Sequence, residues 1–265
     1  MHRIGWIGIN GRLNYIMFAN LLTAHFLADF PLQRDSWITS KRDRKLCGMG
    51  LWLHGLVVFA CTLIALGSVE CLHLAIAIAV SHLLIDFFKV MFTRSGPRAF
   101  ALDQVLHVGV LIFVSKYASH WVDWNQWSFV PSEKELLYPA LVCAYLFCLS
   151  PANYIIREVV KYCHVETCSA VDGMTVKTDN VDKIKRSGML IGSMERFLVL
   201  TFILVGNYEA AGLTVAAKSL LRFNDDEGPR TEYVLVGTLL SISVAVVAAL
   251  TLFKFVMNMP IIKIG

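Results

Sequence analysis

The chain has 265 residues, of which 56% are hydrophobic and 17% are charged, and its formal net charge is +4. Soluble domains carry about 25% charged residues, so this composition excludes an ordinary soluble domain and favours a membrane protein. The positive charge lies in loops between apolar runs and is not taken as a sign of nucleic-acid binding. We expect an all-α fold, a polytopic bundle of transmembrane helices.

Seven apolar runs come close to the roughly 20 residues that a spanning helix needs. In chain order they cover residues 13–33, 50–67, 71–92, 101–118, 136–157, 188–206 and 233–258. The segment 208–222 is short and charged, so it could lie in the interface, re-enter the membrane or cross as a short buried helix. We favour seven spans, because Lys254 and Lys263 then lie on the cytoplasmic side.

Lys and Arg concentrate in three loops, which the positive-inside rule places in the cytoplasm. These loops are residues 34–45, 89–98 and 157–187. The loop 116–135 instead carries three Trp, which suit an interfacial aromatic belt. The predicted divisions are a front helical bundle, a cytoplasmic polar loop and a rear helical segment, at residues 13–160, 161–187 and 188–260.

Ionisable side chains inside the first apolar runs are the most informative feature of the sequence. They are His25, Asp29, His54, His82, Asp86, Asp103 and His107. Three His/Asp pairs have the spacing i, i+4, which places both side chains on one face of a helix. Such groups are costly inside a membrane, so they usually face the bundle interior and serve a function.

These side chains are also predicted to lie at one depth. Each is three to nine residues from the nearest basic loop, which corresponds to roughly 5–14 Å along a helix. Four separate helices therefore bring their His and Asp residues to the cytoplasmic leaflet. The helix boundaries rest on apolar runs and loop charge alone, so nothing in them imposes this agreement.

Four His and three Asp suit Zn²⁺, Fe²⁺ or Mn²⁺ better than Ca²⁺ or Mg²⁺, because imidazole favours transition metals. Seven donors exceed one tetrahedral zinc site, so either two metal ions share the cluster or some Asp residues orient His ligands. We expect a centre of one or two divalent transition-metal ions. A proton relay without metal and a set of structural hydrogen bonds are the alternatives.

The predicted centre also offers groups for catalysis and for substrate binding. Asp103 or Asp29 could act as the general base beside a metal-activated water. Gln33, Gln104 and Lys89 lie close by in the sequence and could orient ligands or bind an anionic substrate group. For Lys89, interfacial snorkelling is the favoured alternative.

Two further polar features lie behind the front bundle. Glu195 and Arg196 fall inside an apolar run, where they could form a structural ion pair facing the bundle or hold a phosphate or carboxylate of the substrate. Cys163, His164 and Cys168 resemble a metal-binding cluster, but their spacing fits no common zinc pattern. The seven Cys are odd in number and scattered, so they form no disulfide framework.

The motifs LLTAHFLADFPLQ, LWLHG, SHLLIDFFK and FALDQVLH resemble a bacterial family of polytopic membrane proteins catalogued as a domain of unknown function. The rear motifs IGSMERFLVL and YEAAGLTVAAKSLLRF resemble longer members, so the likeness covers roughly residues 17–250. It implies a bacterial inner-membrane location and no assigned reaction. The His/Asp pattern is also loosely similar to that of membrane-bound metal-dependent hydrolases.

Three functions follow from these observations. The favoured one is a metal-dependent hydrolase that acts on a phosphoester or lipid-type substrate at the inner leaflet. The second is a divalent-cation transporter, although transport sites usually lie near the midplane at a repeat interface, and this sequence shows neither feature. The third is a non-enzymatic sensor or scaffold in which the metal clamps four helices together.

Overall fold

The computed structural model describes the backbone of residues 3–92, 96–117, 137–163, 178–222 and 229–257. Within these ranges every regular element is a helix, which confirms the predicted all-α class. The chain forms two compact units, Met1–Leu146 with Phe255–Gly265, and Phe147–Lys254. The boundary at residues 146–147 falls before the polar loop at which the sequence placed the division.

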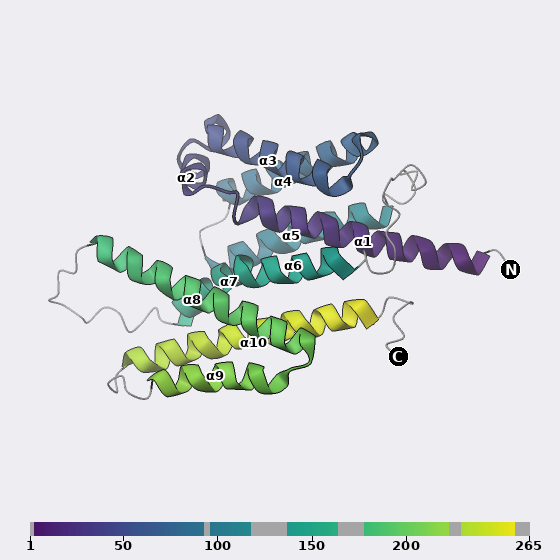
Figure 1. Ribbon diagram of the computed structural model, residues 1–265. Coiled ribbons are helices and arrows are strands. Elements are labelled where there is room, and N and C mark those ends of the chain that lie inside the picture. The colour runs from purple at the N-terminus through teal and green to yellow at the C-terminus, as the bar shows by residue number, and fades with distance from the viewer. Residues whose placement is uncertain (1–2, 93–95, 118–136, 164–177, 223–228, 258–265) are drawn as a thin grey trace. The chain divides into compact units, whose positions relative to one another are not determined.

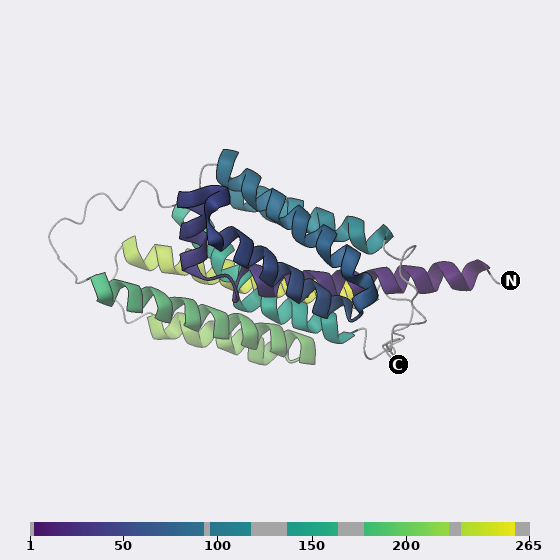
Figure 2. The ribbon, with the colours of Figure 1, turned by 90° about the horizontal axis from the view of Figure 1, so that it is seen from above.

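The first unit is built on four long helices (Figure 1). Its elements are α1 (Arg3–Asp29), α2 (Asp35–Arg44), the 3₁₀ turn η1 (Lys45–Cys47), α3 (Met49–Leu66), the 3₁₀ turn η2 (Val69–Cys71), α4 (Leu72–Phe92), α5 (Pro97–Tyr117) and most of α6 (Leu137–Leu149). Helix α1 packs against α3 and α5, and α4 packs against the same two helices. The four long helices therefore form a closed ring, and they run side by side in both views (Figures 1 and 2).

A glycine cap sets the register of α3 and α4. Gly67 ends α3 with a φ of 66°, and its N–H donates to the carbonyls of Leu63 and Ile64 at 3.1 Å. The chain then reverses through η2 into α4. His54 lies 13 residues before Gly67 and His82 lies 15 residues after it, so the two histidines reach the same height of the hairpin.

Two glycines allow neighbouring helices to approach closely. A Cβ on Gly55 of α3 would lie 2.7 Å from Cδ2 of Leu83 on α4. A Cβ on Gly50 would lie 2.5 Å from the carbonyl oxygen of Trp37 on α2. The first contact brings α3 against α4 beside His54, and the second holds α2 on the first turn of α3. From the sequence, residues 34–45 are expected to form a loop, whereas the structure shows helix α2 there.

Among the residues that the structure describes, six segments are long and apolar enough to cross a membrane. They are Met49–Leu66, Val69–Phe92, Arg98–Lys116, Leu137–Val160, Gly188–Val205 and Val236–Lys254. The predicted polytopic membrane protein is thereby confirmed, and these segments correspond to six of the seven expected spans. Helix α1, which carries His25 and Asp29, is not among the six, so the number of spans stays a prediction.

The second unit contains α7 (Pro151–Cys163), α8 (Thr178–Val205), α9 (Tyr208–Arg222) and most of α10 (Pro229–Met257). Helix α8 packs against both α7 and α9. Residues 178–187 of the predicted polar loop are helical, because α8 begins at Thr178. Helix α9 has 15 residues, so the ambiguous segment 208–222 is one short helix. His164 and Cys168 of the weak metal motif and the Trp residues of the 116–135 loop lie outside the described residues.

Candidate metal centre

The structure brings all seven predicted His and Asp side chains together inside the four-helix ring. Helix α1 supplies His25 and Asp29, α3 supplies His54, α4 supplies His82 and Asp86, and α5 supplies Asp103 and His107. His54 has no exposed surface, and the other three imidazoles are at most 5% exposed. Their i, i+4 spacing places each pair on the inward face of its helix, as the sequence indicated.

The closest group of potential ligand atoms lies where α1, α3 and α4 meet. Oδ1 of Asp29 is 3.4 Å from Nε2 of His54 and 3.2 Å from Nε2 of His82. The two imidazole nitrogens are 2.9 Å apart. Ligands about 2.0–2.1 Å from a tetrahedral metal ion are about 3.3 Å from one another, so these three atoms have the separations of ligands around one ion.

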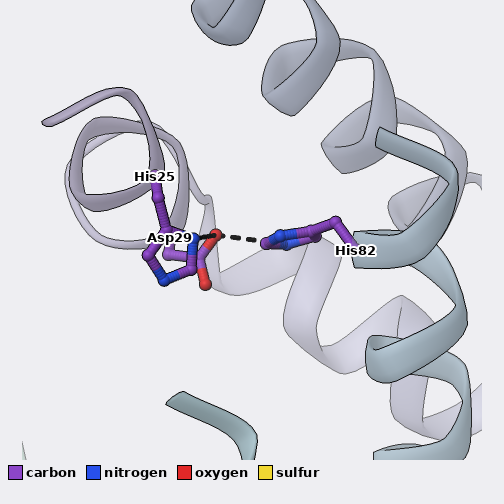
Figure 3. Close-up of side chains that lie close together, drawn as sticks. All are labelled: His25, Asp29 and His82. Carbon is purple, nitrogen blue, oxygen red and sulfur yellow. Dashed lines mark ion pairs between the residues drawn. The ribbon is translucent and has the colours of Figure 1, made fainter. Parts of the chain in front are cut away.

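His25 faces the same carboxylate from α1 (Figure 3). Its Nδ1 lies 3.7 Å from Oδ1 of Asp29, and its Nε2 lies 3.4 Å from Oε1 of Gln104. Donation from Nε2 to Gln104 leaves the Nδ1 lone pair directed at Asp29. Gln104 also donates to Oδ2 of Asp103 at 3.2 Å, so it connects His25 to α5 as an orienting residue.

A second group of ligand atoms comes from α4 and α5. Asp86, Asp103 and His107 could together hold an ion. His107 Nδ1 donates to the backbone carbonyl of Asp103 at 2.8 Å, which leaves a lone pair on Nε2. In the described part of the chain, His107 Nε2, Asp103 Oδ1 and His54 Nδ1 are buried without a hydrogen-bond partner. Buried polar atoms are nearly always satisfied, so the two acceptors Asp103 Oδ1 and His107 Nε2 fit a cation or a water molecule bound at this group.

The imidazole rings join the two groups into one cluster. The ring of His107 lies 4.0 Å from that of His82 and 5.1 Å from that of His25, measured between centroids. The rings of His54 and His82 are 5.0 Å apart. A small cavity of about 10 Å³ borders His25, His82 and His107, which is about the space that one water needs.

Two lysines reach carboxylates of this cluster. The ammonium of Lys41, on α2, contacts Oδ2 of Asp86, and this lysine is buried. Nζ of Lys89 lies 2.7 Å from Oδ2 of Asp103, while 37% of the Lys89 side chain stays exposed. The snorkelling role of Lys89 stays a prediction, and the structure adds the ion pair with Asp103. From the sequence, Lys41 is expected only among the charges of a cytoplasmic loop and not at the site.

The remaining predicted substrate-binding residues belong to elements other than the four helices of the ring. Gln33 lies in the turn after α1, between that helix and α2. Glu195 and Arg196 belong to the second unit, where each contacts a partner of its own, and an ion pair between the two stays a prediction. Glu195 contacts Lys218 of α9. Adjacent residues on a helix point about 100° apart, which explains why the two side chains diverge.

Arg196 is held by neutral acceptors. Its Nε donates to the Cys148 carbonyl at 2.7 Å, and its Nη1 donates to Oγ of Ser241 at 2.8 Å. Its Nη2 donates to Asn153 and, at 3.3 Å, to Ser193. These bonds tie α6, α7 and α10 to α8, so the guanidinium serves the packing of the second unit.

The fold and the buried cluster define a polytopic helical membrane protein with a His/Asp centre among its first helices. Residues 17–137 match a family model described as a protein of unknown function (DUF3307). The resemblance to a catalogued family of unknown function is confirmed over this range, which contains all seven cluster residues. No curated protein and no solved structure matches the chain, and the similarity to membrane-bound hydrolases stays a prediction.

Proposed function

We propose that this membrane protein binds a divalent transition metal in its four-helix ring and uses it to hydrolyse a phosphoester. The observation that carries the proposal is the meeting of Asp29 Oδ1, His54 Nε2 and His82 Nε2 within 3.4 Å of one another, from three helices. His25 faces the same carboxylate oxygen and completes a set of four ligands. Imidazole and carboxylate together suit Zn²⁺, Fe²⁺ or Mn²⁺.

A shared proton is the simplest alternative at this geometry. Two imidazole nitrogens 2.9 Å apart could be joined by one N–H in the absence of a metal. That arrangement does not account for the buried Nε2 of His107 and Oδ1 of Asp103, which have no partner among the described residues. A water molecule held by the metal, in the small cavity that His107 borders, would donate hydrogen bonds to such acceptors.

Hydrolysis is the chemistry that the surroundings of the cluster favour. A bound transition metal activates water and stabilises charge on a phosphoryl oxygen. Asp103 is our candidate general base in preference to Asp29, because Asp29 lies among the imidazoles while Oδ1 of Asp103 is open to accept a proton. Lys89 is the partly exposed cation of the cluster, so an anionic substrate would reach the site along this side chain.

Turnover measurements test this reaction directly. The metal-loaded protein in detergent is offered soluble phosphate mono- and diesters in one arm and phospholipid vesicles in another, which separates the two sources of a phosphoester. Asp103→Asn should lower turnover by about 10²–10⁴-fold while bound metal is unchanged. Asp35→Asn, at an exposed position on α2, is the matched control.

Two outcomes would contradict the hydrolase. One is full turnover in the Asp103→Asn protein. The other is a folded wild-type protein that holds metal and hydrolyses no phosphoester in either arm. In that second case, metal-dependent cation flux in proteoliposomes would indicate a transporter, and unfolding on metal removal would indicate a structural clamp.

A further inference from the structure

Lys41 is an unusual member of the cluster, because it is a charged residue and the one buried residue of helix α2. Its neighbours on α2, Arg42, Asp43 and Arg44, are all exposed, whereas Lys41 is 6% exposed. The close approach of α2 to Gly50 fixes this helix against the start of α3. The ammonium of Lys41 is thereby directed at the carboxylate of Asp86.

The carboxylates of the cluster differ in the charged side chains that contact them. Asp86 contacts the ammonium of Lys41, and Asp103 contacts that of Lys89 at 2.7 Å. Both belong to the ligand group of α4 and α5. A divalent ion placed in this group would lie close to two ammonium ions, and the repulsion between like charges at such distances is strong in a buried site.

Asp29 is surrounded by imidazole rings. Its Oδ1 lies within 3.7 Å of a ring nitrogen of each of His25, His54 and His82. Neutral imidazoles offer lone pairs to a cation and do not repel it. The ligand groups thus differ in the contacts of their carboxylates, since imidazoles surround Asp29, whereas Asp86 and Asp103 beside His107 each contact a lysine.

We infer that the cluster holds one metal ion, at Asp29, and that Lys41 is a positioning residue that occupies Asp86 in place of a second ion. The inference rests on the proposed metal site and adds its metal count. Lys41 also keeps Asp86, whose Oδ2 is 3.6 Å from Nε2 of His54, from competing with Asp29 as a ligand. Removal of the Lys41 charge should open the second ligand group to a metal.

A metal titration tests the number of metal ions that each chain binds. Metal-free protein in detergent is dialysed against Zn²⁺ alone, and separately against Mn²⁺ alone, and bound metal per chain is measured by mass spectrometry. The wild type should bind one equivalent and Lys41→Met should bind two. Lys41→Arg, which keeps the charge, and Arg42→Met, which removes a charge from the exposed face of α2, should each bind one.

Each departure from this pattern has a defined meaning. Two equivalents in the wild type, or one in Lys41→Met, would overturn the inference and leave the metal site standing. No bound metal in folded wild-type protein would overturn the metal site itself. A merely structural role for Lys41 would change stability and leave the metal count at one in every variant that folds.

A second pair of variants keeps the inference testable when Lys41→Met does not fold, since loss of one partner from a buried ion pair is strongly destabilising. Lys41→Met/Asp86→Asn, which removes both charges of the buried pair, should still bind one equivalent, because Asp86 is not a required ligand. Asp29→Asn should bind none. Loss of the metal from the double variant as complete as that from Asp29→Asn would overturn the inference.

Discussion

The Nε2 atoms of His54 and His82 lie 2.9 Å apart, and the next residue along each helix, Gly55 on α3 and Leu83 on α4, is in close contact with the other. A Cβ on Gly55 would lie 2.7 Å from Cδ2 of Leu83. The distance between the two imidazoles therefore depends on the absence of a side chain at Gly55. This relationship connects the packing of the ring to the geometry of its centre.

Gly55→Ala should weaken both the fold and the site. The added methyl group forces α3 and α4 apart or displaces Leu83, and overpacking of this kind costs about 1–3 kcal/mol. Thermal unfolding in detergent measures the loss, and metal affinity should fall with it. Gly109→Ala on α5 is the control, because a Cβ there meets nothing within 4 Å. Equal stability of the two variants would contradict the close-packing argument.

Asp29→Asn should abolish metal binding. The substitution keeps the shape of the side chain and removes the charge that three imidazoles face. Bound metal per chain, measured on the folded variant, should fall to background. Asp35→Asn, which changes an exposed carboxylate on α2, should retain the wild-type content. Retention of the metal in the Asp29 variant would mean that the ion is held elsewhere.

Gln104→Ala should weaken metal binding without changing the number of ions. Gln104 bridges His25 and Asp103, and loss of such an orienting partner typically costs about 10–100-fold in metal affinity. Competition with a chelator of known affinity measures the change. If affinity were unchanged while turnover fell, Gln104 would contact substrate instead of orienting His25.

Much of the centre could be predicted because its members follow the helical repeat. The spacing of His82 and Asp86 places both on one face of α4, and distance from basic loops gives their depth. Polar groups in an apolar helix have few favourable places other than the bundle interior. These local rules were sufficient to assemble the cluster from separate helices.

The lysine partners could not be predicted in the same way. Lys41 lies among five basic residues of one segment, and nothing local distinguishes it from Arg42 or Lys45. Lys41 reaches Asp86 because helix α2 packs against Gly50, and this packing is a tertiary contact. The divergence of Glu195 and Arg196, by contrast, follows from helical geometry and was foreseeable.

Arg196→Lys should destabilise the second unit and leave the metal centre intact. Lysine keeps the charge but cannot reproduce the bonds to Cys148, Ser241 and Asn153, so we expect a loss of about 2–3 kcal/mol. Arg157→Lys, at an exposed position on α7, should change stability by less than about 0.5 kcal/mol. Normal stability with reduced turnover would instead restore the predicted substrate-binding role of Arg196.

The metal content of the purified protein tests the central claim most directly. Wild-type protein, a His25→Ala/His82→Ala variant and a His73→Ala control are purified in detergent, checked for folding and analysed by mass spectrometry. His73 is exposed and contacts the Glu70 carbonyl at 3.0 Å, so its loss should not matter. We predict one equivalent of Zn, Fe or Mn in the wild type and the control, and none in the double variant. Folded wild-type protein without metal, even after reconstitution, would contradict the account and make the cluster a proton relay or a hydrogen-bonded clamp.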